Sequence, residues 1–288
     1  MQPKVNRKVL LNLGCGTRYH PEWINIDFIQ TGRGVIAHDL LRGIPLGSNS
    51  CDVVYNSHLL EHFPPEDAVT FIRECHRVLK LRGVIRVAVP DLEEIVKNYQ
   101  TYLLLAIKGN KKAEANYDWT MLELYDQFGR NYSEGQMGAL YNKGDAINAD
   151  FIYKRVGVKL SAPSKLQINL KLAIRKPRIF LTETLKQLIR IFRAVNIKLN
   201  IRELLLQMLL GKEFKYYKIG KFRLSGEPHQ WMYDRFSLAR LLRQAGFKET
   251  HVCNARSSSI AKWNSYYLDI NKDGTVYKPD SIFIEAVK

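Results

Sequence analysis

The sequence has few cysteines, and their spacing does not bring them into one motif. The four cysteines, Cys15, Cys51, Cys75 and Cys253, lie far apart along 288 residues. No two of them form a C-x-x-C pair, so neither a disulfide framework nor a cysteine-held zinc site is expected. This usage is typical of a reducing compartment, and we expect a cytoplasmic location.

Long hydrophobic runs are also missing. The first residues, Met1 to Lys8, are not followed by an apolar stretch of the signal-peptide type. The densest apolar segment, Leu204 to Leu210, is far shorter than the ~20 residues of a membrane-spanning helix. We therefore expect neither a signal peptide nor a membrane span.

Acidic residues are scarce in one part of the chain. Residues 154–223 contain 18 Lys and Arg but only three acidic residues, whereas the rest of the chain is nearly neutral. Charge of one sign attracts an anionic partner, such as a membrane surface, a nucleic acid or a phosphate-bearing substrate. A solvated surface without a ligand explains the same composition, so the charge alone does not identify the partner.

Short apolar segments separated by turn residues fill the first ninety positions. We predict strands at 8–13, 23–27, 35–37, 52–56 and 84–89. Between the last two strands, an amphipathic helix should begin at Pro65 and extend to about Leu79. A strand, a helix and a strand at this spacing predict a parallel crossover, and hence an α/β sheet with helices on its faces.

From about Ile95 to Ser225 the pattern becomes mostly helical. Two basic amphipathic helices are expected, one at 182–195 and one at 201–210 with Asn200 as its cap. Their apolar faces either pack together as a lid or rest on an anionic membrane. Aromatic residues interleaved with glycine are sparse, which favours lipid over nucleic acid.

An α/β pattern resumes near the end of the sequence. Ser237 is expected to cap a helix that stops at Gly246, and strands are predicted at 251–260 and 282–287. We therefore expect an α/β core of normal single-domain size, interrupted by a largely helical basic insertion. The expected boundaries are 1–94 for the first part of the core, 95–225 for the insertion and 226–288 for the second part of the core.

Glycines follow the first predicted strand directly. Gly14 and Gly16 would let a ligand approach the backbone at the carboxyl edge of a parallel sheet. The next strand ends in Asp27, whose carboxylate can accept both hydroxyls of a ribose, and Asp39 follows the third strand. A dinucleotide site would need a third glycine where Tyr19 stands. A cofactor with a ribose but no pyrophosphate fits better, while a tight turn and strand-end caps are the structural alternative.

The order of these motifs resembles the class I S-adenosylmethionine-dependent methyltransferases, specifically the type-11-like bacterial branch. The matching segments are LNLGCG (11–16), WINIDF (23–28), HDL (38–40), CDVVYNSHLLEH (51–62), ECHRVLKLRG (74–83), VAVPDLE (87–93), HQWMYDRFSLARLLRQAGF (229–247) and KPDSIFIEA (278–286). The resemblance implies a Rossmann-like, doubly wound, mainly parallel seven-stranded sheet with an antiparallel last strand. It also implies S-adenosyl-L-methionine as the cofactor.

The resemblance assigns cofactor-binding roles to residues at the strand ends. The positions concerned are Gly14, Cys15, Gly16, Asp27, Asp39, Leu40 and Asn56. By resemblance, the glycines would face the methionine part and Asp27 would hold the ribose hydroxyls. Asp39 with Leu40 would contact the adenine, and Asn56 would close the pocket.

Two departures from the family pattern affect the expected geometry. Only six residues, Thr17 to Glu22, separate the glycines from the second strand, so the first helix should shrink to about one turn. Leu81 and Arg82 stand where the family has proline and glycine before the fifth strand.

Methyl transfer from a sulfonium is an in-line displacement, so an enzyme mainly aligns the acceptor and shields the reaction. A hydroxyl acceptor also benefits from a base. The candidate catalytic residues are His58, His62, His229, Tyr233 and Asp234. Each histidine can equally be a packed or capping side chain. The fourth predicted strand is not followed by an N-P-P-Y motif. The sequence therefore does not support methylation of the amino groups of bases or glutamine through that motif.

Two other motifs suggest metals. His58 to His62 spells H-x-x-E-H, a metallopeptidase pattern that needs a sustained helix, yet Pro64 and Pro65 follow at once. Asp269 to Asp280 begins like a calcium loop but lacks the closing glutamate. An Asp-Gly turn is favoured there, and no metal site is predicted from the sequence.

Two functions follow from these observations. The first is a methyltransferase acting on an oxygen or nitrogen of a small-molecule or glycan-type acceptor, including anionic or lipid-linked ones. The second is a weakly active or inactive cofactor-binding scaffold whose segment 154–224 binds an anionic membrane or, less favoured, a nucleic acid. Either is compatible with peripheral contact at the inner membrane face.

Overall fold

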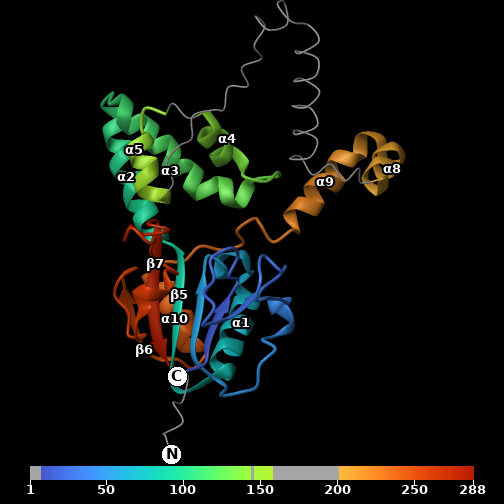
Figure 1. Cartoon of the computed structure of the whole chain (residues 1–288). Coiled ribbons are helices and arrows are strands. Elements are labelled where there is room, and N and C mark those ends of the chain that lie inside the picture. Colours follow the sequence, from blue (N-terminus) through green and yellow to red (C-terminus); the bar gives the residue numbers. More distant parts are fainter. Residues whose placement is uncertain (1–7, 144–145, 158–200) are drawn as a thin grey trace, which may run out of the picture.

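The structure, a computed structural model, describes residues 8–143, 146–157 and 201–288 of the chain. Figure 1 shows a central sheet with helices against it and a separate group of helices at one end. The helix expected at 182–195 and the cap expected at Asn200 lie outside the described residues.

A seven-stranded sheet with the order β3-β2-β1-β4-β5-β7-β6 forms the centre of the fold. Its strands are β1 (Leu10–Leu13), β2 (Ile24–Asp27), β3 (Val35–Ala37), β4 (Cys51–Ser57), β5 (Leu79–Pro90), β6 (Lys248–Cys253) and β7 (Ser281–Val287). The pairings among β1 to β5 are parallel, and β7 runs antiparallel to both β5 and β6. The predicted doubly wound, Rossmann-like sheet with an antiparallel last strand is therefore confirmed.

The register of the sheet places the carboxyl ends of three strands together. β1 lies between β2 and β4, and its last residue, Leu13, is opposite both Ile26 and Asn56. The residues that follow these three positions therefore meet at one edge of the sheet. This edge is where open α/β sheets bind their ligands.

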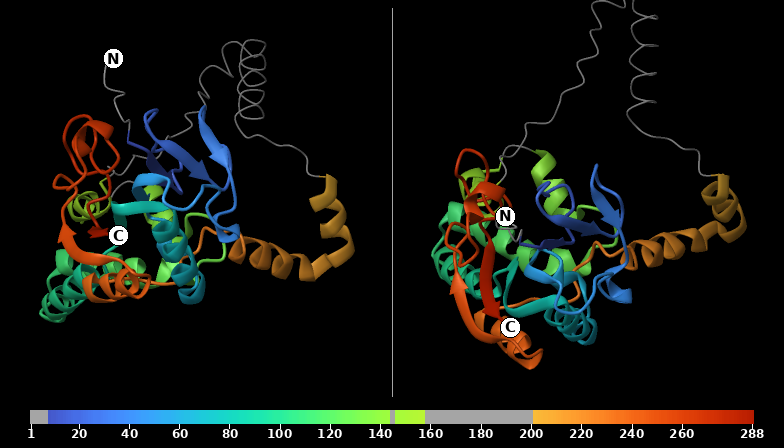
Figure 2. Two further views of the ribbon diagram at one scale, coloured as in Figure 1. Left: turned by 90° about the horizontal axis from the view of Figure 1, so that it is seen from below. Right: turned by 60° about the horizontal axis from the view of Figure 1, so that its bottom comes forward.

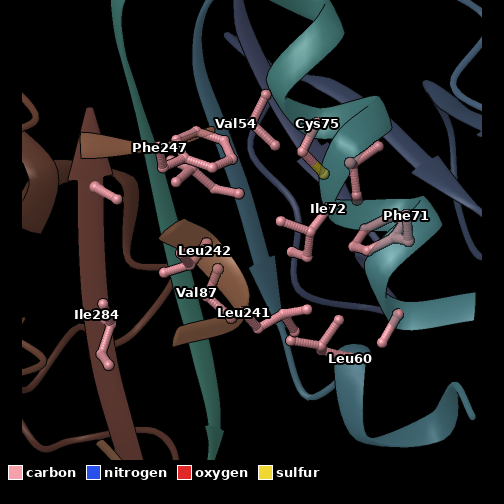
Figure 3. Close-up of a cluster of buried hydrophobic side chains, with 14 of the residues drawn as sticks. Val54, Leu60, Phe71, Ile72, Cys75, Val87, Leu241, Leu242, Phe247 and Ile284 are labelled. Carbon is pink, nitrogen blue, oxygen red and sulfur yellow. The ribbon is translucent and has the colours of Figure 1, made fainter. Parts of the chain in front are cut away.

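Two helices cover one face of the sheet, α1 (Pro65–Val78) and α10 (Arg235–Gln244). Figure 3 shows Ile72 of α1, Leu242 of α10 and Val87 of β5 in one cluster, and all three side chains are fully buried. The apolar residues of α1 recur at helical spacing, so one face of this helix is removed from water while the other stays exposed.

The other face of the sheet is covered by residues 254–280, in which η4 (Trp263–Tyr266) is a short 3-10 helix. Tyr55 points to this side, whereas its neighbour Val54 belongs to the helix-covered cluster. The two faces therefore differ in chemistry, because aromatic rings in edge-to-face contact replace aliphatic packing on the second face.

Buried ion pairs hold residues 254–280 against the sheet. The Arg86 guanidinium lies 2.8 Å from Asp269 and 2.7 Å from Glu285, and its side chain is 0% exposed. Tyr55 donates its hydroxyl hydrogen to Asp269 over 2.5 Å. Asp269 opens the calcium-like segment of the sequence, and here its carboxylate is used by Arg86 and Tyr55. The turn expected in this segment forms at Gly274, which has a φ of +81°.

The described helices between β5 and α10 lie beyond one end of the sheet. They are α2 (Leu92–Ile107), α3 (Lys111–Gly129), α4 (Gly135–Lys143), α5 (Ala149–Val156), α8 (Ile201–Leu210) and α9 (Phe214–Arg223). Figures 1 and 2 show α2 to α5 gathered together, while α8 and α9 extend away from the sheet. None of the described helices is both long enough and apolar enough to cross a membrane.

The single helical turn expected between the glycines and β2 does not form, because residues 14–23 contain turns and no helix. Two buried asparagines take over the hydrogen bonding that a helix would supply. Asn12 Nδ2 donates to the Arg18 carbonyl over 3.1 Å, and Asn25 Nδ2 donates to the His20 carbonyl over 2.9 Å.

Two predictions near the C-terminus were wrong in detail. Asp234, and not Ser237, is the N-cap of α10, since the Ser237 N–H donates to the Asp234 carboxylate over 2.7 Å in a capping box. The strand expected at 251–260 is β6 and covers Lys248–Cys253. The residues after Cys253 do not continue the strand. They cross the second face of the sheet, where Ile260, Trp263 and Leu268 are buried.

Candidate active site

A glycine bend follows β1. Gly14 and Gly16 have φ values of +63° and +50°, in the left-handed region that glycine adopts most easily. A Cβ atom at Gly14 would lie 2.8 Å from the side chain of Leu59, so this position also needs glycine for space. The Gly16 N–H donates to Asp27 Oδ2 over 2.7 Å, which ties the bend to the end of β2.

A hollow of about 500 Å³ opens at this edge of the sheet. Five of the seven predicted cofactor residues line it: Gly14, Gly16, Asp27, Asp39 and Leu40. The structure thus brings together side chains from the ends of three strands. Asp39 also accepts a hydrogen bond from the Leu41 N–H over 3.1 Å, so it caps a short helix as well as facing the hollow.

Sequence reasoning missed Phe28 as a member of this site. Phe28 follows Asp27, lines the same hollow and is 71% exposed. A large aromatic ring left in water beside a ribose-type carboxylate offers a stacking surface for a planar base. The sequence feature that could have indicated this role is the position of Phe28 directly after Asp27, the last residue of β2.

A second hollow of about 220 Å³ shares Gly14, Gly16 and His58 with the first. Cys15 lies in its wall and is buried. Burial, helped by the charge of Asp27, raises the pKa of the Cys15 thiol to about 11. The thiol is therefore neutral at physiological pH, and Cys15 lines the hollow without serving as a nucleophile.

Two basic residues that sequence reasoning did not select face the second hollow, Arg18 and Lys278. Arg18 is held in place because its guanidinium donates to Asn271 Oδ1 over 3.1 Å and lies 4.1 Å from the Tyr277 ring centroid. Lys278 has no ion-pair or hydrogen-bond partner among the described residues. Burial lowers the pKa of its amine, although Glu61 and Asp280 oppose that change.

Asn56, expected to close the cofactor pocket, lies in neither hollow. Its side chain is fully buried within β4, and its amide makes no hydrogen bond with the part of the chain that the structure describes. The next two residues, Ser57 and His58, line the second hollow instead. Tyr55, on the other side of Asn56, also lines the second hollow, so the neighbours of Asn56 form the wall in its place.

Three of the candidate catalytic histidines meet around Glu61. His58 Nδ1 lies 3.2 Å from Glu61 Oε1, and His58 Nε2 lies 2.7 Å from the Ser281 hydroxyl. The rings of His62 and His229 pack edge to face with their centroids 4.8 Å apart. His58 and His62 line the first hollow, so this cluster borders the candidate cofactor site.

Burial and the neighbouring charges change the pKa values of Glu61, His62 and His229. Burial opposes ionisation of Glu61, but the histidines around it, His58 foremost, outweigh burial and lower its pKa to about 2. Burial lowers the pKa of His229 to about 3 and also lowers that of His62. The neighbouring imidazoles therefore favour the ionised form of Glu61, whereas burial favours the uncharged forms of His62 and His229.

Tyr233 and Asp234 are placed differently from the histidines. Tyr233 is 3% exposed and belongs to the hydrophobic cluster under α1 and α10. Burial, reinforced by the charge of Glu61, raises the pKa of its hydroxyl. Asp234 is the N-cap of α10 and borders neither hollow. The structure thus gives Asp234 a capping role in place of the catalytic role considered from the sequence.

Residues 29–87 match the family model described as Methyltransferase domain. Two proteins from two strains of Mycobacterium tuberculosis, each named a probable S-adenosylmethionine-dependent methyltransferase, are 29% identical to the chain over 108 residues. The alignment covers 32% of this chain and 39% of the length of each relative.

Solved structures that are similar to the chain include an S-adenosylmethionine-dependent methyltransferase from Archaeoglobus fulgidus. It is 12% identical, with 98% of this chain and 87% of that chain covered at a TM-score of 0.37. Another is the 1,6-didemethyltoxoflavin-N1-methyltransferase of Burkholderia thailandensis, solved with 1,6-didemethyltoxoflavin and S-adenosylhomocysteine. It is 17% identical over 30% of this chain and 46% of that chain, at a TM-score of 0.25.

Proposed function

We propose that the chain, whose resemblance to S-adenosylmethionine-dependent methyltransferases is confirmed by the family match over residues 29–87, is itself such an enzyme. One observation carries the proposal. The glycine bend and two strand-end carboxylates, Asp27 and Asp39, line a single hollow at the carboxyl edge of a parallel sheet.

The residues of the first hollow fit an adenosyl group. Asp27 would accept the ribose hydroxyls while its Oδ2 holds the Gly16 N–H. Asp39 and Leu40 would contact the adenine edge, and the exposed ring of Phe28 would cover the adenine face. Each group therefore matches one part of the adenosine, and none of them requires a pyrophosphate.

The second hollow fits the amino-acid end of the same cofactor. It begins at the shared Gly14 and Gly16 and contains the positive groups of Arg18 and Lys278. A carboxylate placed there would meet a lysine that forms no ion pair within 4.0 Å among the described side chains, although the charges of Glu61 and Asp280 act on it. Because hydrogen bonds between charged groups are the strong ones, Lys278 is the main candidate for holding this carboxylate.

S-adenosylmethionine supplies a methyl group on a positively charged sulfur. What the chain contributes is placement and exclusion of water. Leu59 and Phe63 form an apolar wall of the first hollow, and residues 224–226 border it from the segment after α9. We propose an oxygen or nitrogen of a small-molecule or glycan-type acceptor as the methylated atom, because His58 brings an imidazole to the junction of the two hollows.

The proposal is tested by equilibrium binding of S-adenosylmethionine to the purified chain, measured by calorimetry. Radiolabelled methyl transfer into fractionated cell extracts would then identify the acceptor. Saturable binding with one site per chain is the expected result. A folded protein that gives no binding heat at millimolar cofactor would contradict the proposal.

We further propose that α8 and α9 make peripheral contact with an anionic membrane. Leu205, Met208 and Leu209 of α8 are 53%, 72% and 82% exposed, and residues 212–223 carry five basic side chains and one acidic side chain. Each basic residue near an anionic leaflet contributes about 1 kcal/mol. Co-sedimentation with phosphatidylglycerol vesicles, lost with neutral vesicles or high salt, is expected. Binding to nucleic acid but not to vesicles would contradict the membrane contact.

A further inference from the structure

The cluster of Glu61, His62 and His229 contains more unused ligand atoms than any packing role explains. One ligand atom from each residue lies within 4.8 Å of the others. Glu61 is 0% exposed and His229 is 7% exposed. Neither carboxylate oxygen of Glu61, nor Nδ1 of His62 or of His229, makes a hydrogen bond with any described residue.

Leaving these atoms without partners is costly. A buried carboxylate that is neither paired nor hydrogen-bonded costs several kcal/mol, so native folds usually compensate it. His58 approaches one oxygen of Glu61, but its ring is already held by Ser281 and it leaves the other oxygen free. The second oxygen of Glu61 and Nδ1 of His62 and of His229 therefore remain as unused ligand atoms.

The backbone holds the three residues rigidly, although they are far apart in sequence. The Gln230 N–H donates to the Glu61 carbonyl over 2.7 Å, and the His229 N–H donates to the Gln127 carbonyl over 3.1 Å. The His62 and His229 rings pack edge to face with their centroids 4.8 Å apart, and Nδ1 of each ring has no hydrogen-bond partner among the described residues.

We propose that Glu61, His62 and His229 bind a divalent transition-metal cation, with Zn²⁺, Co²⁺ or Mn²⁺ as the chemical class. Two imidazole nitrogens and one carboxylate oxygen suit these ions, whereas Ca²⁺ and Mg²⁺ prefer sites made of oxygen alone.

The position of the site suggests its use. Three protein ligands leave coordination positions open, and His62 and His58 border the hollow of about 500 Å³. A cation there would lower the pKa of an acceptor hydroxyl and favour its deprotonated form. This role rests on the proposed methyltransferase function, whereas the metal site itself does not.

The test is metal binding by the full chain after treatment with a chelator. Zn²⁺ and Co²⁺ are titrated separately by calorimetry, and the visible spectrum of the Co²⁺ form is recorded. One equivalent per chain and cobalt bands of a low-coordination nitrogen and oxygen site are expected. His229→Ala and His62→Ala should each weaken binding at least about tenfold, as loss of metal-site groups does.

The matched control is His251→Ala, because His251 is an exposed histidine on β6 and borders neither hollow. It should bind the metal as the parent does. His229→Gln serves where the alanine variant fails to fold, which circular dichroism shows. Absence of one-equivalent binding by the folded parent, or equal binding by all variants, would overturn the metal site.

The two proposals fail separately. If the chain binds metal but no S-adenosylmethionine, the metal site stands and the proposed function falls. If it binds S-adenosylmethionine but no metal, only the metal site falls.

Discussion

Gly16 and Asp27 are joined by a hydrogen bond of 2.7 Å from the glycine N–H to the carboxylate, across the ends of two neighbouring strands. This bond uses Oδ2 of Asp27. Oδ1 receives a longer bond of 3.4 Å from the Ile29 N–H. The carboxylate is thus fixed in direction before any ligand arrives, and several predictions about this site and its support can be tested.

Replacing Asp27 should remove most of the affinity for S-adenosylmethionine. Asp27→Ala loses two charged hydrogen bonds to the ribose and releases the glycine bend, so a loss of ~10–100-fold in affinity is expected. Asp27→Asn keeps an acceptor for the Gly16 N–H and should bind more tightly than the alanine variant. Calorimetry measures both, with the exposed Asp118→Ala on α3 as control. Equal affinity in all three variants would contradict the ribose assignment.

Removing the amine of Lys278 should weaken binding of the amino-acid end of the cofactor only. Lys278→Met keeps the buried stem but removes the charge, and we expect ~10-fold weaker binding of S-adenosylmethionine. Methylthioadenosine, which lacks the carboxylate, should bind the variant and the parent equally. An equal loss for both ligands would show instead that the substitution disturbs the whole hollow.

Arg86→Met should destabilise the fold. The substitution leaves the carboxylates of Asp269 and Glu285 buried without their shared cation, and the expected loss is about 3–5 kcal/mol. Urea unfolding gives the free energy, and the exposed Arg73→Met on α1 is the matched control. A loss no larger than that of the control would mean that water or other groups compensate the two acids.

Arg82→Gly should stabilise the chain. Arg82 has a φ of +64°, in the left-handed region that costs residues with a side chain roughly 1–2 kcal/mol. The gain is partly offset by the greater freedom of glycine in the unfolded chain, so about 1 kcal/mol and a few degrees in Tm are expected. Arg73→Gly, in the middle of α1, should instead cost about 1 kcal/mol. Melting curves compare the two.

Acid should weaken the fold partly through Glu74. Hydrogen bonds from Arg77, together with the Ile44 N–H, lower the pKa of Glu74 below its ordinary value of 4.5. Its stabilising contribution is therefore complete above that value and is lost as the pH falls through the lowered pKa. Glu74→Gln should lose about 1–2 kcal/mol at pH 7 and show a shallower decline in acid. The exposed Glu249→Gln should follow the parent curve.

The parts of the site that could be predicted are those encoded within a few residues of a strand end. Gly14, Gly16, Asp27 and Asp39 follow apolar segments directly, so parallel pairing alone brings them together. Asn56 was placed in the pocket by resemblance, but a shift of one residue along a strand reverses the side-chain direction. Its neighbours face the hollows instead.

The remaining parts depend on contacts between distant segments. His229 meets His62 because the chain returns to the sheet after the helices α2 to α9, and no local pattern indicates that distance. Lys278 lines the second hollow and belongs to residues 254–280, which cover the face of the sheet opposite α1. The ion pair between Arg86 and Asp269 holds this segment against the sheet. Asp234 is the N-cap of α10, although Ser237 was predicted for this role. Both residues belong to one capping box, and their spacing does not show which of the two is the N-cap.

The walls of the two hollows come from residues within 12–18, 27–28, 38–41, 55–64 and 224–226, and from Leu268, Tyr277 and Lys278. A single small molecule spanning both would act as a non-covalent crosslink between the beginning, middle and end of the polypeptide. Any such molecule is bound only by the native state, so at a hundredfold excess over its Kd it would add about 2.7 kcal/mol to the resistance of the whole chain to unfolding.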